Sequence, residues 1–179
     1  MPIIIRPETP ADYARIYEVT EAAFRDLPIS DHTEQHLVNR LRNSAAYIPQ
    51  LALVAELEGE VVGHILFTRA VIVGPDRSWD TLTLAPVSVA PDHQRCGIGG
   101  QLIRTGIELA RGLGYDLINV LGHAEYYPRF GFMPASRYGV RCPYDVPDEV
   151  FMLQELRPGV LNDVSGVVQY APEFDTVGH

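Results

Sequence analysis

A glycine-rich stretch that follows a short apolar segment has the composition of an anion-binding loop. Val87 and Val89 suit an extended strand, and Pro86 and Pro91 bracket them. Apolar residues then recur three or four positions apart over residues 102–113, which predicts a helix. The first turn of a helix has free N–H groups that bind anions, and glycine lets a phosphate approach the backbone closely. The sequence therefore predicts a phosphate site at Gln94, Arg95, Cys96, Gly97, Ile98, Gly99 and Gly100.

The spacing of these glycines distinguishes between several kinds of phosphate loop. A P-loop requires a lysine after its last glycine, and none is present. The dinucleotide-binding fingerprint requires a third glycine where Leu102 stands. A strand-to-helix turn without a ligand is the alternative for these residues alone. The pattern from Gln94 to Gly99, Gln/Arg-x-x-Gly-x-Gly/Ala, resembles the pyrophosphate signature of the GNAT superfamily of N-acyltransferases.

A second motif occurs downstream, after the apolar segment 117–121. Residues 126–132 read Tyr-Tyr-Pro-Arg-Phe-Gly-Phe. The superfamily often has Tyr-x-x-x-Gly-Phe after its fifth strand, and Tyr127, Gly131 and Phe132 match it. The full motif resembles a bacterial branch of predicted acetyltransferases, although residues 122–124 replace the common upstream Asn-x-x-Ala pattern. Because both motifs occur in family order, the chain is identified as a member of the superfamily over most of its length.

This resemblance implies acetyl-CoA as the cosubstrate and no metal. It implies that the pantetheine arm bonds to the backbone of Val87, Ser88 and Val89, and that the pyrophosphate binds the N–H groups of Arg95 through Gly100. It gives Tyr127 the role of the general acid that meets the leaving thiolate. Tyr126 competes for that role or contacts the cofactor, and ring packing is the other interpretation of Tyr127. An amine would attack the thioester directly.

The sequence predicts fewer residues of the acyl-acceptor site than of the cofactor site. In the superfamily, the segment that joins the first two helices forms one wall of this site, which here would include Leu27, Ile29, Asp31, His32 and Glu34. Glu34 could act as a general base or bind an ammonium group, or it could be a carboxylate favoured by the helix dipole. The predicted function is acetyl transfer to an amine of a small molecule or protein. The alternative is a non-catalytic acyl-CoA-binding module, and the retained Tyr127 favours the enzyme.

Composition limits the remaining function classes. The chain has 179 residues and a net charge of −9, which argues against binding to nucleic acids or anionic membranes. Two cysteines indicate no disulfide framework, and no signal peptide or apolar span of about 20 residues is present, which predicts a cytoplasmic protein. His93-x-x-Cys96 has metal-like spacing but lacks further ligands. His64, within a predicted strand, is interpreted as a packed or hydrogen-bonded residue.

The elements around the motifs predict an α/β (α+β) fold with a mixed, mostly antiparallel twisted sheet flanked by helices. The helical crossover between residues 89 and 117 predicts a parallel strand pair, which the resemblance implies is splayed. Strands are expected over residues 3–5, 51–57, 60–73, 82–89, 117–121, 150–156 and 166–170, helices over 9–24, around 37–41 and over 98–111, and a long loop over 134–148. Residues 1–157 would form the acetyltransferase domain. Residues 158–179 would pack on it as an extension with flexible last residues, covering a sheet edge or contributing to a homodimer.

Overall fold

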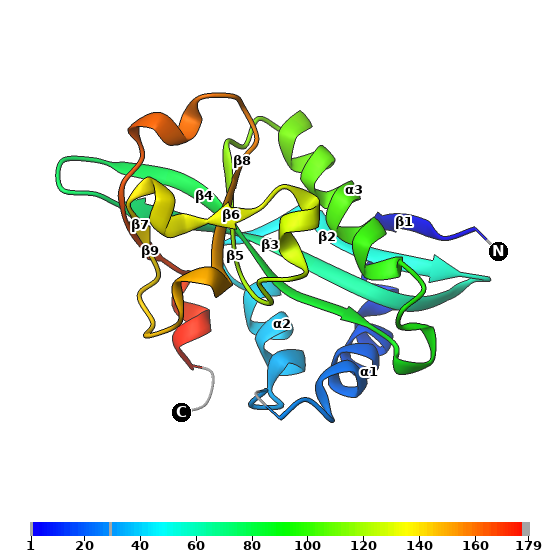
Figure 1. The fold of residues 1–179 in the computed structure, drawn as a ribbon. Coiled ribbons are helices and arrows are strands. Elements are labelled where there is room, and N and C mark those ends of the chain that lie inside the picture. Colours follow the sequence, from blue (N-terminus) through cyan, green and yellow to red (C-terminus); the bar gives the residue numbers. More distant parts are fainter. Residues whose placement is uncertain (1, 29, 177–179) are drawn as a thin grey trace.

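The protein folds around one mixed sheet, shown in Figure 1, and its computed structural model describes residues 2–28 and 30–176. The main row of strands is β1 (Ile4–Pro7), β2 (Tyr47–Leu57), β3 (Glu60–Val73), β4 (Ser78–Val89), β5 (Leu117–Leu121), β8 (Phe151–Glu155) and β6 (Met133–Pro134). Two further strands, β7 (Val140–Arg141) and β9 (Gly166–Gln169), pair with each other, and β9 also pairs with β3. The β4–β5 and β7–β9 pairs are parallel, and the other pairs are antiparallel.

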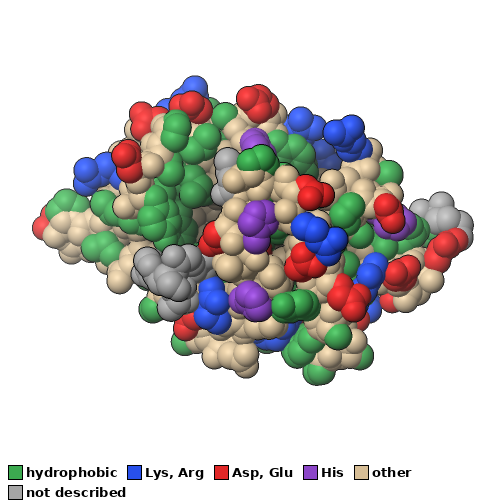
Figure 2. Space-filling model, turned by 90° about the horizontal axis from the view of Figure 1, so that it is seen from below, with side chains coloured by type: hydrophobic (Ala, Val, Ile, Leu, Met, Phe, Trp, Pro, Cys, Tyr) green, Lys and Arg blue, Asp and Glu red, His purple; other side chains and the backbone are tan. Residues whose placement is uncertain are grey.

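Three helices cover the two faces of the sheet. α1 (Tyr13–Phe24) and α2 (Glu34–Arg42) lie below the sheet in the view of Figure 1, and α3 (Ile98–Gly112) lies above it. On α3, Gly106 leaves the space that the ring of Phe67 fills, so the helix packs closely on β3. Seen from below, acidic and basic side chains lie beside one another, and hydrophobic side chains gather toward the left (Figure 2).

This architecture confirms the predicted α/β (α+β) fold class. The strands β1 to β4 are antiparallel, and α3 is the crossover that makes β5 parallel to β4. Several boundaries differ from the prediction: α1 begins later than expected, after a 3-10 turn over Pro10–Asp12, and β2 and β4 begin earlier. β2 begins at Tyr47, which pairs with Thr68 before a register shift between Tyr47 and Ala52, and β4 begins at Ser78, which pairs with Val73.

Residues 134–148, expected as a single long loop, contain short regular segments. Pro134 ends β6, a 3-10 turn spans Ala135–Tyr138, and β7 follows it. Gly139 ends the turn with a φ of 72°, a left-handed conformation that favours glycine. Buried side chains such as Ala135 and Val140 hold this segment on the sheet, which is why it is more ordered than its polar composition indicates.

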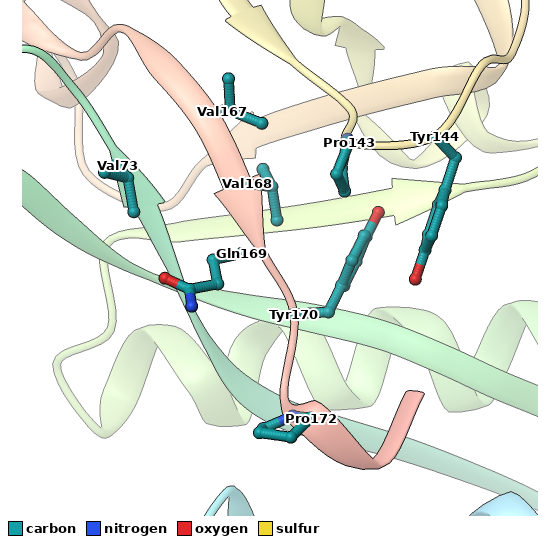
Figure 3. Close-up of a pocket in the computed structure, with 8 residues that line it drawn as sticks. All are labelled: Val73, Pro143, Tyr144, Val167, Val168, Gln169, Tyr170 and Pro172. Atoms are coloured by element: carbon teal, nitrogen blue, oxygen red, sulfur yellow. The ribbon is translucent and has the colours of Figure 1, made fainter. Parts of the chain in front are cut away.

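The C-terminal segment packs back on the sheet through β9. Val167, Val168 and Gln169 pair with the last residues of β3, and Leu161 and Val164 are buried. This packing leaves a mostly apolar cavity of about 360 Å³, in which the rings of Tyr144 and Tyr170 stack with centroids 5.5 Å apart (Figure 3). The division into 1–157 and 158–179 stays a prediction, and the last residues, 177–179, lie outside the described residues.

Candidate active site

The parallel strands β4 and β5 separate after a very short contact. They pair only at Leu82 with Ile118 and at Thr83 with Asn119. Toward its C-terminal end, β4 continues to Val89 with β3 on one edge only. In this part β4 also carries an extra residue relative to β3, because Ile65 pairs with Val87 but Phe67 pairs with Leu84. Such a bulge bends a strand, which helps β4 diverge from β5 and opens a gap lined by backbone groups.

The register decides which backbone groups of β4 face this gap. Ala90 N–H donates to the carbonyl of Val62 at 2.8 Å, and bonded pairs alternate along an antiparallel ladder. The N–H and C=O of Ser88 therefore point to β3, whereas those of Val87 and Val89 point into the gap. The Ser88 hydroxyl lies 3.3 Å from that of Thr20 on α1. Val87 and Val89 are thus the residues whose main chain can pair with a ligand, and Ser88 supports the strand.

The predicted phosphate loop joins β4 to α3. Gly97 is the residue before the first helical turn and has a φ of 83°, and Arg95 also has a positive φ of 65°. The N–H of Gln101 donates a hydrogen bond to the carbonyl of Gly97 at 3.1 Å. The N–H groups of the residues between them, Ile98, Gly99 and Gly100, are the unbonded amides of a helix start. The dipole of α3 adds partial positive charge, so this turn is suited to bind a phosphate.

The other side chains of the loop have separate tasks. Gln94 Nε2 donates to the carbonyl of Val89 at 3.0 Å and thereby fixes the loop to the end of β4. Ile98 is buried between α3 and the sheet and anchors the helix. Cys96 is exposed, with its thiol 3.6 Å from the carbonyl of Gln94. No Cβ at Gly97 would meet another atom within 4 Å, so the space above this glycine is open to a ligand.

Tyr126 and Tyr127 lie on the other side of the gap, after β5. Tyr127 begins the 3-10 turn η3 (Tyr127–Phe130), and its ring packs edge-on against Phe132 with centroids 5.9 Å apart. It is only 7% exposed, and burial raises the pKa of its hydroxyl to about 12. Gly122 has no room for a Cβ, because the Tyr127 ring occupies that position. The structure therefore places Tyr127 in a closely packed setting where its ring cannot reorient freely.

Tyr126 is less buried and extends toward α3. A Cβ built on Gly99 would lie 3.3 Å from the Tyr126 hydroxyl, so this hydroxyl borders the first turn of the helix. Burial raises its pKa, and the nearby Arg129 and Arg104 counteract that shift. The two tyrosines thus have different positions. Tyr126 approaches the predicted phosphate site, whereas Tyr127 lies in the core beside the gap.

The predicted acceptor wall is the connection between α1 and α2. Glu34 opens α2 and accepts a hydrogen bond from the Ser30 hydroxyl, with Oε2 at 2.6 Å. This is the setting of a carboxylate at a helix N-terminus, and it leaves the proposed general-base role untested. Leu27 is 42% exposed, and Asp31 and His32 are exposed as well. Ile29 lies outside the described residues.

Sequence reasoning did not identify three residues that shape the site. Gly122 provides the space for Tyr127, and its position directly after an apolar strand was the available signal. Arg104 and Arg129 carry guanidinium groups next to Phe130 and Tyr126, at 4.8 Å and 4.9 Å from the ring centroids. Arg129 is the basic residue of the Tyr-Tyr-Pro-Arg-Phe-Gly-Phe motif, and its place in that motif was the available signal.

The cavity between β3 and β9 lies apart from this site. The cavity of Figure 3 contacts the far end of β3, at Val73, whereas Gly63 of the same strand pairs with Val89 beside the phosphate loop. Ten strand residues separate these positions, which corresponds to roughly 30 Å.

Within the described part of the chain, no cluster of three His, Cys, Asp or Glu side chains is arranged to hold a metal ion. No described helix is long and apolar enough to cross a membrane.

Comparison with known proteins places this geometry in a family. Residues 14–132 match the Acetyltransferase (GNAT) family. The chain is 44% identical over 150 residues to the uncharacterized N-acetyltransferase YjhQ of Escherichia coli K12, covering 82% of this chain and 80% of that protein. It is 31% identical over 174 residues to the uncharacterized N-acetyltransferase YhbS of the same strain, covering 97% and 99%.

Solved structures agree with this assignment. A GNAT family acetyltransferase from Brucella melitensis, in complex with acetyl-CoA, is 37% identical with a TM-score of 0.79, covering 97% of this chain and 99% of that one. The structure of E. coli YhbS in complex with CoA is 28% identical with a TM-score of 0.83, covering 98% and 93%. The splayed strands, the glycine loop and these similarities lead to one conclusion: the chain belongs to the GNAT family of N-acetyltransferases.

Proposed function

We propose that this chain binds acetyl-CoA in the gap between β4 and β5 and transfers the acetyl group to an amine of a small molecule or protein. One observation carries the proposal. The backbone groups of Val87 and Val89 that have no strand partner lead directly into the free N–H groups at the start of α3. The relatives solved with acetyl-CoA and CoA support the same cosubstrate for this chain.

The residues of the site fit the parts of this cosubstrate. Val87 offers its N–H and C=O, and Val89 its N–H, to the amides of a pantetheine arm, which would pair with β4 as a strand does. The N–H groups from Ile98 to Gly100 and the dipole of α3 offer a site for the pyrophosphate. The left-handed Gly97, with open space above it, allows the phosphate to approach the backbone.

Acetyl transfer from the bound cosubstrate requires few further groups of the protein. Bound acetyl-CoA supplies an activated thioester whose carbonyl carbon an amine can attack directly, with the CoA thiolate as the leaving group. A backbone N–H near Val89 would stabilise the negative charge that develops on the carbonyl oxygen. Glu34 as the base that takes the proton from the amine stays a prediction, as do the cytoplasmic location and the homodimer.

Tyr127 would donate a hydrogen bond to the departing sulfur. With a pKa of about 12, the Tyr127 hydroxyl remains protonated at neutral pH and can serve as a donor. Complete proton transfer to a thiolate with an ordinary pKa of about 8.5 would be uphill by roughly 3.5 units, or about 5 kcal/mol. We therefore assign Tyr127 the role of a hydrogen-bond donor that stabilises the thiolate, whose final proton comes from solvent.

The proposal is tested by acetyl-CoA turnover with a panel of amines, with release of the CoA thiol as the readout. Tyr127→Phe keeps the packed ring and removes only the hydroxyl. We expect kcat to fall by roughly 10- to 1,000-fold while the affinity for CoA changes little. Tyr126→Phe is the matched variant in the neighbouring ring and should keep most of kcat.

The outcomes separate the alternatives. Full turnover in Tyr127→Phe together with a large loss in Tyr126→Phe would move the donor role to Tyr126, whose hydroxyl borders α3. If calorimetry shows acetyl-CoA binding but no amine of the panel is acetylated, the non-catalytic acyl-CoA-binding module becomes the better description. If the protein does not bind acetyl-CoA, both descriptions fail.

A further inference from the structure

Two guanidinium groups lie close together near the start of α3. The chain has a net charge of −9, and six of its 14 arginines pair with a carboxylate among the described residues, namely Arg6, Arg15, Arg25, Arg42, Arg111 and Arg157. Among the described residues, no carboxylate pairs with Arg104 or Arg129. Because these two groups lie at one site, they give that site a local excess of positive charge.

These two arginines belong to one stacked arrangement, which we name the arginine stack: Arg104, Phe130, Tyr126 and Arg129. The Arg104 guanidinium lies over the Phe130 ring at 4.8 Å, and the Arg129 guanidinium lies over the Tyr126 ring at 4.9 Å. The two rings contact each other edge-on, with centroids 5.1 Å apart. The stack therefore links α3 to η3 and presents a cation at each end.

The stack borders the predicted pyrophosphate site. A Cβ on Gly100 would lie 3.2 Å from Nη1 of Arg104, and a Cβ on Gly99 would lie 3.3 Å from the hydroxyl of Tyr126. Arg129 Nε also donates to the Tyr126 carbonyl at 3.1 Å, which fixes the direction of its guanidinium. Both arginines thus flank the first turn of α3 without belonging to the loop that supplies the free N–H groups.

We propose that Arg104 and Arg129 form a second anion subsite that binds the 3′-phosphate of CoA. This inference rests on the proposed function, because it assumes that the pyrophosphate occupies the backbone N–H groups at the start of α3. The ribose that carries the 3′-phosphate is also attached to the pyrophosphate, so the two phosphate groups of the ligand are neighbours. A phosphate monoester carries a charge near −2 at neutral pH, and guanidinium groups bind it in a bidentate manner.

The ring contacts explain why this subsite would be effective although it is exposed. A guanidinium on an aromatic ring is held in position before the ligand arrives, so less side-chain freedom is lost on binding. The subsite would therefore distinguish CoA from 3′-dephospho-CoA, which has the same pantetheine arm and pyrophosphate. We assign this distinction to Arg104 and Arg129, since the loop amides would contact only groups that both ligands share.

Calorimetry with CoA and 3′-dephospho-CoA at one salt concentration tests the proposal. The unmodified protein should bind CoA roughly 10- to 100-fold more tightly than 3′-dephospho-CoA. Arg104→Gln and Arg129→Gln should each weaken CoA binding by about 3- to 10-fold, and the double variant should bind both ligands equally. Arg77→Gln is the matched control, because Arg77 lies 4.8 Å over the Trp79 ring at the opposite end of β4.

Each outcome has a distinct meaning. Equal binding of CoA and 3′-dephospho-CoA by the unmodified protein overturns the subsite and leaves the proposed function intact. A loss in the double variant that is equal for both ligands also overturns it, because the arginines would then act on the shared pyrophosphate or on the fold. If neither ligand binds the unmodified protein, the proposed function itself fails.

Discussion

Two groups of charged side chains in this protein use arginine in opposite ways. In the first, the Glu8 cluster (Glu8, Arg42, Tyr47 and His64), one carboxylate receives hydrogen bonds from three side chains. Arg42 Nε and Nη2 donate to it at 2.8 Å and 3.0 Å, Tyr47 donates at 2.6 Å, and His64 Nε2 lies at 2.9 Å. The second group is the arginine stack, whose two guanidinium groups contact rings and no described carboxylate.

The two groups differ in how their charges are compensated. Burial alone would raise the pKa of Glu8, but the hydrogen bonds from His64, Arg42 and Tyr47 outweigh this effect and lower it to about 2. The Glu8 side chain is 1% exposed, so its charge is compensated entirely from within the protein. The arginine stack is open to solvent and lacks such compensation, which a bound anion would supply.

The largest expected effect comes from breaking the Glu8 cluster. Glu8→Gln removes the negative charge and leaves the Arg42 guanidinium, only 8% exposed, without a counter-ion. Because an uncompensated buried charge is costly, we expect the free energy of unfolding to fall by about 3–5 kcal/mol, measured by urea denaturation. Binding of CoA by the folded protein should be unchanged, since the cluster belongs to the sheet and α2.

Two further variants show whether the lost pairing is responsible. Glu21→Gln removes one side of the exposed Glu21–Arg25 pair on α1 and should unfold like the parent protein. Adding Arg42→Met to Glu8→Gln removes the stranded charge and should recover part of the loss. If the double variant is no more stable than Glu8→Gln, the cost arises from packing and not from charge.

The next effect is a loss of stability in acid. The pKa of Glu8 is lowered from 4.5 to about 2 in the folded protein, so its contribution is fully present above pH 4.5 and is lost as the pH falls toward 2. A difference of roughly 2.5 units corresponds to about 3 kcal/mol. Asp12, paired with Arg6, has its pKa lowered from 3.8 to about 2 and adds to the loss at lower pH.

Unfolding measured at pH values between 6 and 3 checks this prediction, with Glu8→Gln as the comparison. The variant lacks the titrating group, so its stability should change less between about pH 4.5 and 3.8, before Asp12 contributes. Parallel curves for the two proteins would show that Glu8 is not responsible for the acid sensitivity.

The two charged groups also differ in how far the sequence predicts them. The phosphate loop and the tyrosine motif are local, so glycine spacing and the Tyr-x-x-x-Gly-Phe pattern identified them together with the strands and the helix around them. The partners of Glu8 are Arg42, Tyr47 and His64, which lie 34, 39 and 56 positions away. Periodicity contains no information about such contacts, because they arise only when β2, β3 and α2 assemble.

The same limit applies within the candidate site. The sequence predicted Val87, Ser88 and Val89 as a set, but the ladder register turns the Ser88 backbone toward β3, and register depends on the neighbouring strand. Local sequence patterns likewise did not predict that β9 pairs with the end of β3. The apolar residues of the C-terminal segment indicated only that this segment packs on the domain. Local elements and motifs could therefore be predicted from the sequence, whereas the alignment of each element with its partners could not.

The smallest expected effect concerns the loop that the arginine stack borders. Gly97 and Gly59 form a matched pair, because their φ values are 83° and 82° and neither would place a Cβ within 4 Å of another atom. Valine at either position must adopt a left-handed backbone, so we expect a similar loss of stability, on the order of 1–3 kcal/mol. Only Gly97→Val would place a side chain where the phosphate approaches, and its affinity for CoA should fall by roughly 10- to 100-fold.

Calorimetry and urea denaturation of both variants measure the affinity for CoA and the free energy of unfolding separately. Gly59→Val, in the turn between β2 and β3, should bind CoA like the parent protein. Equal affinities for both variants would mean that Gly97 serves the turn alone and that the phosphate binds elsewhere. A loss confined to Gly97→Val would instead show that the open space above this glycine belongs to the ligand, as the uncompensated charge of the neighbouring arginines indicates.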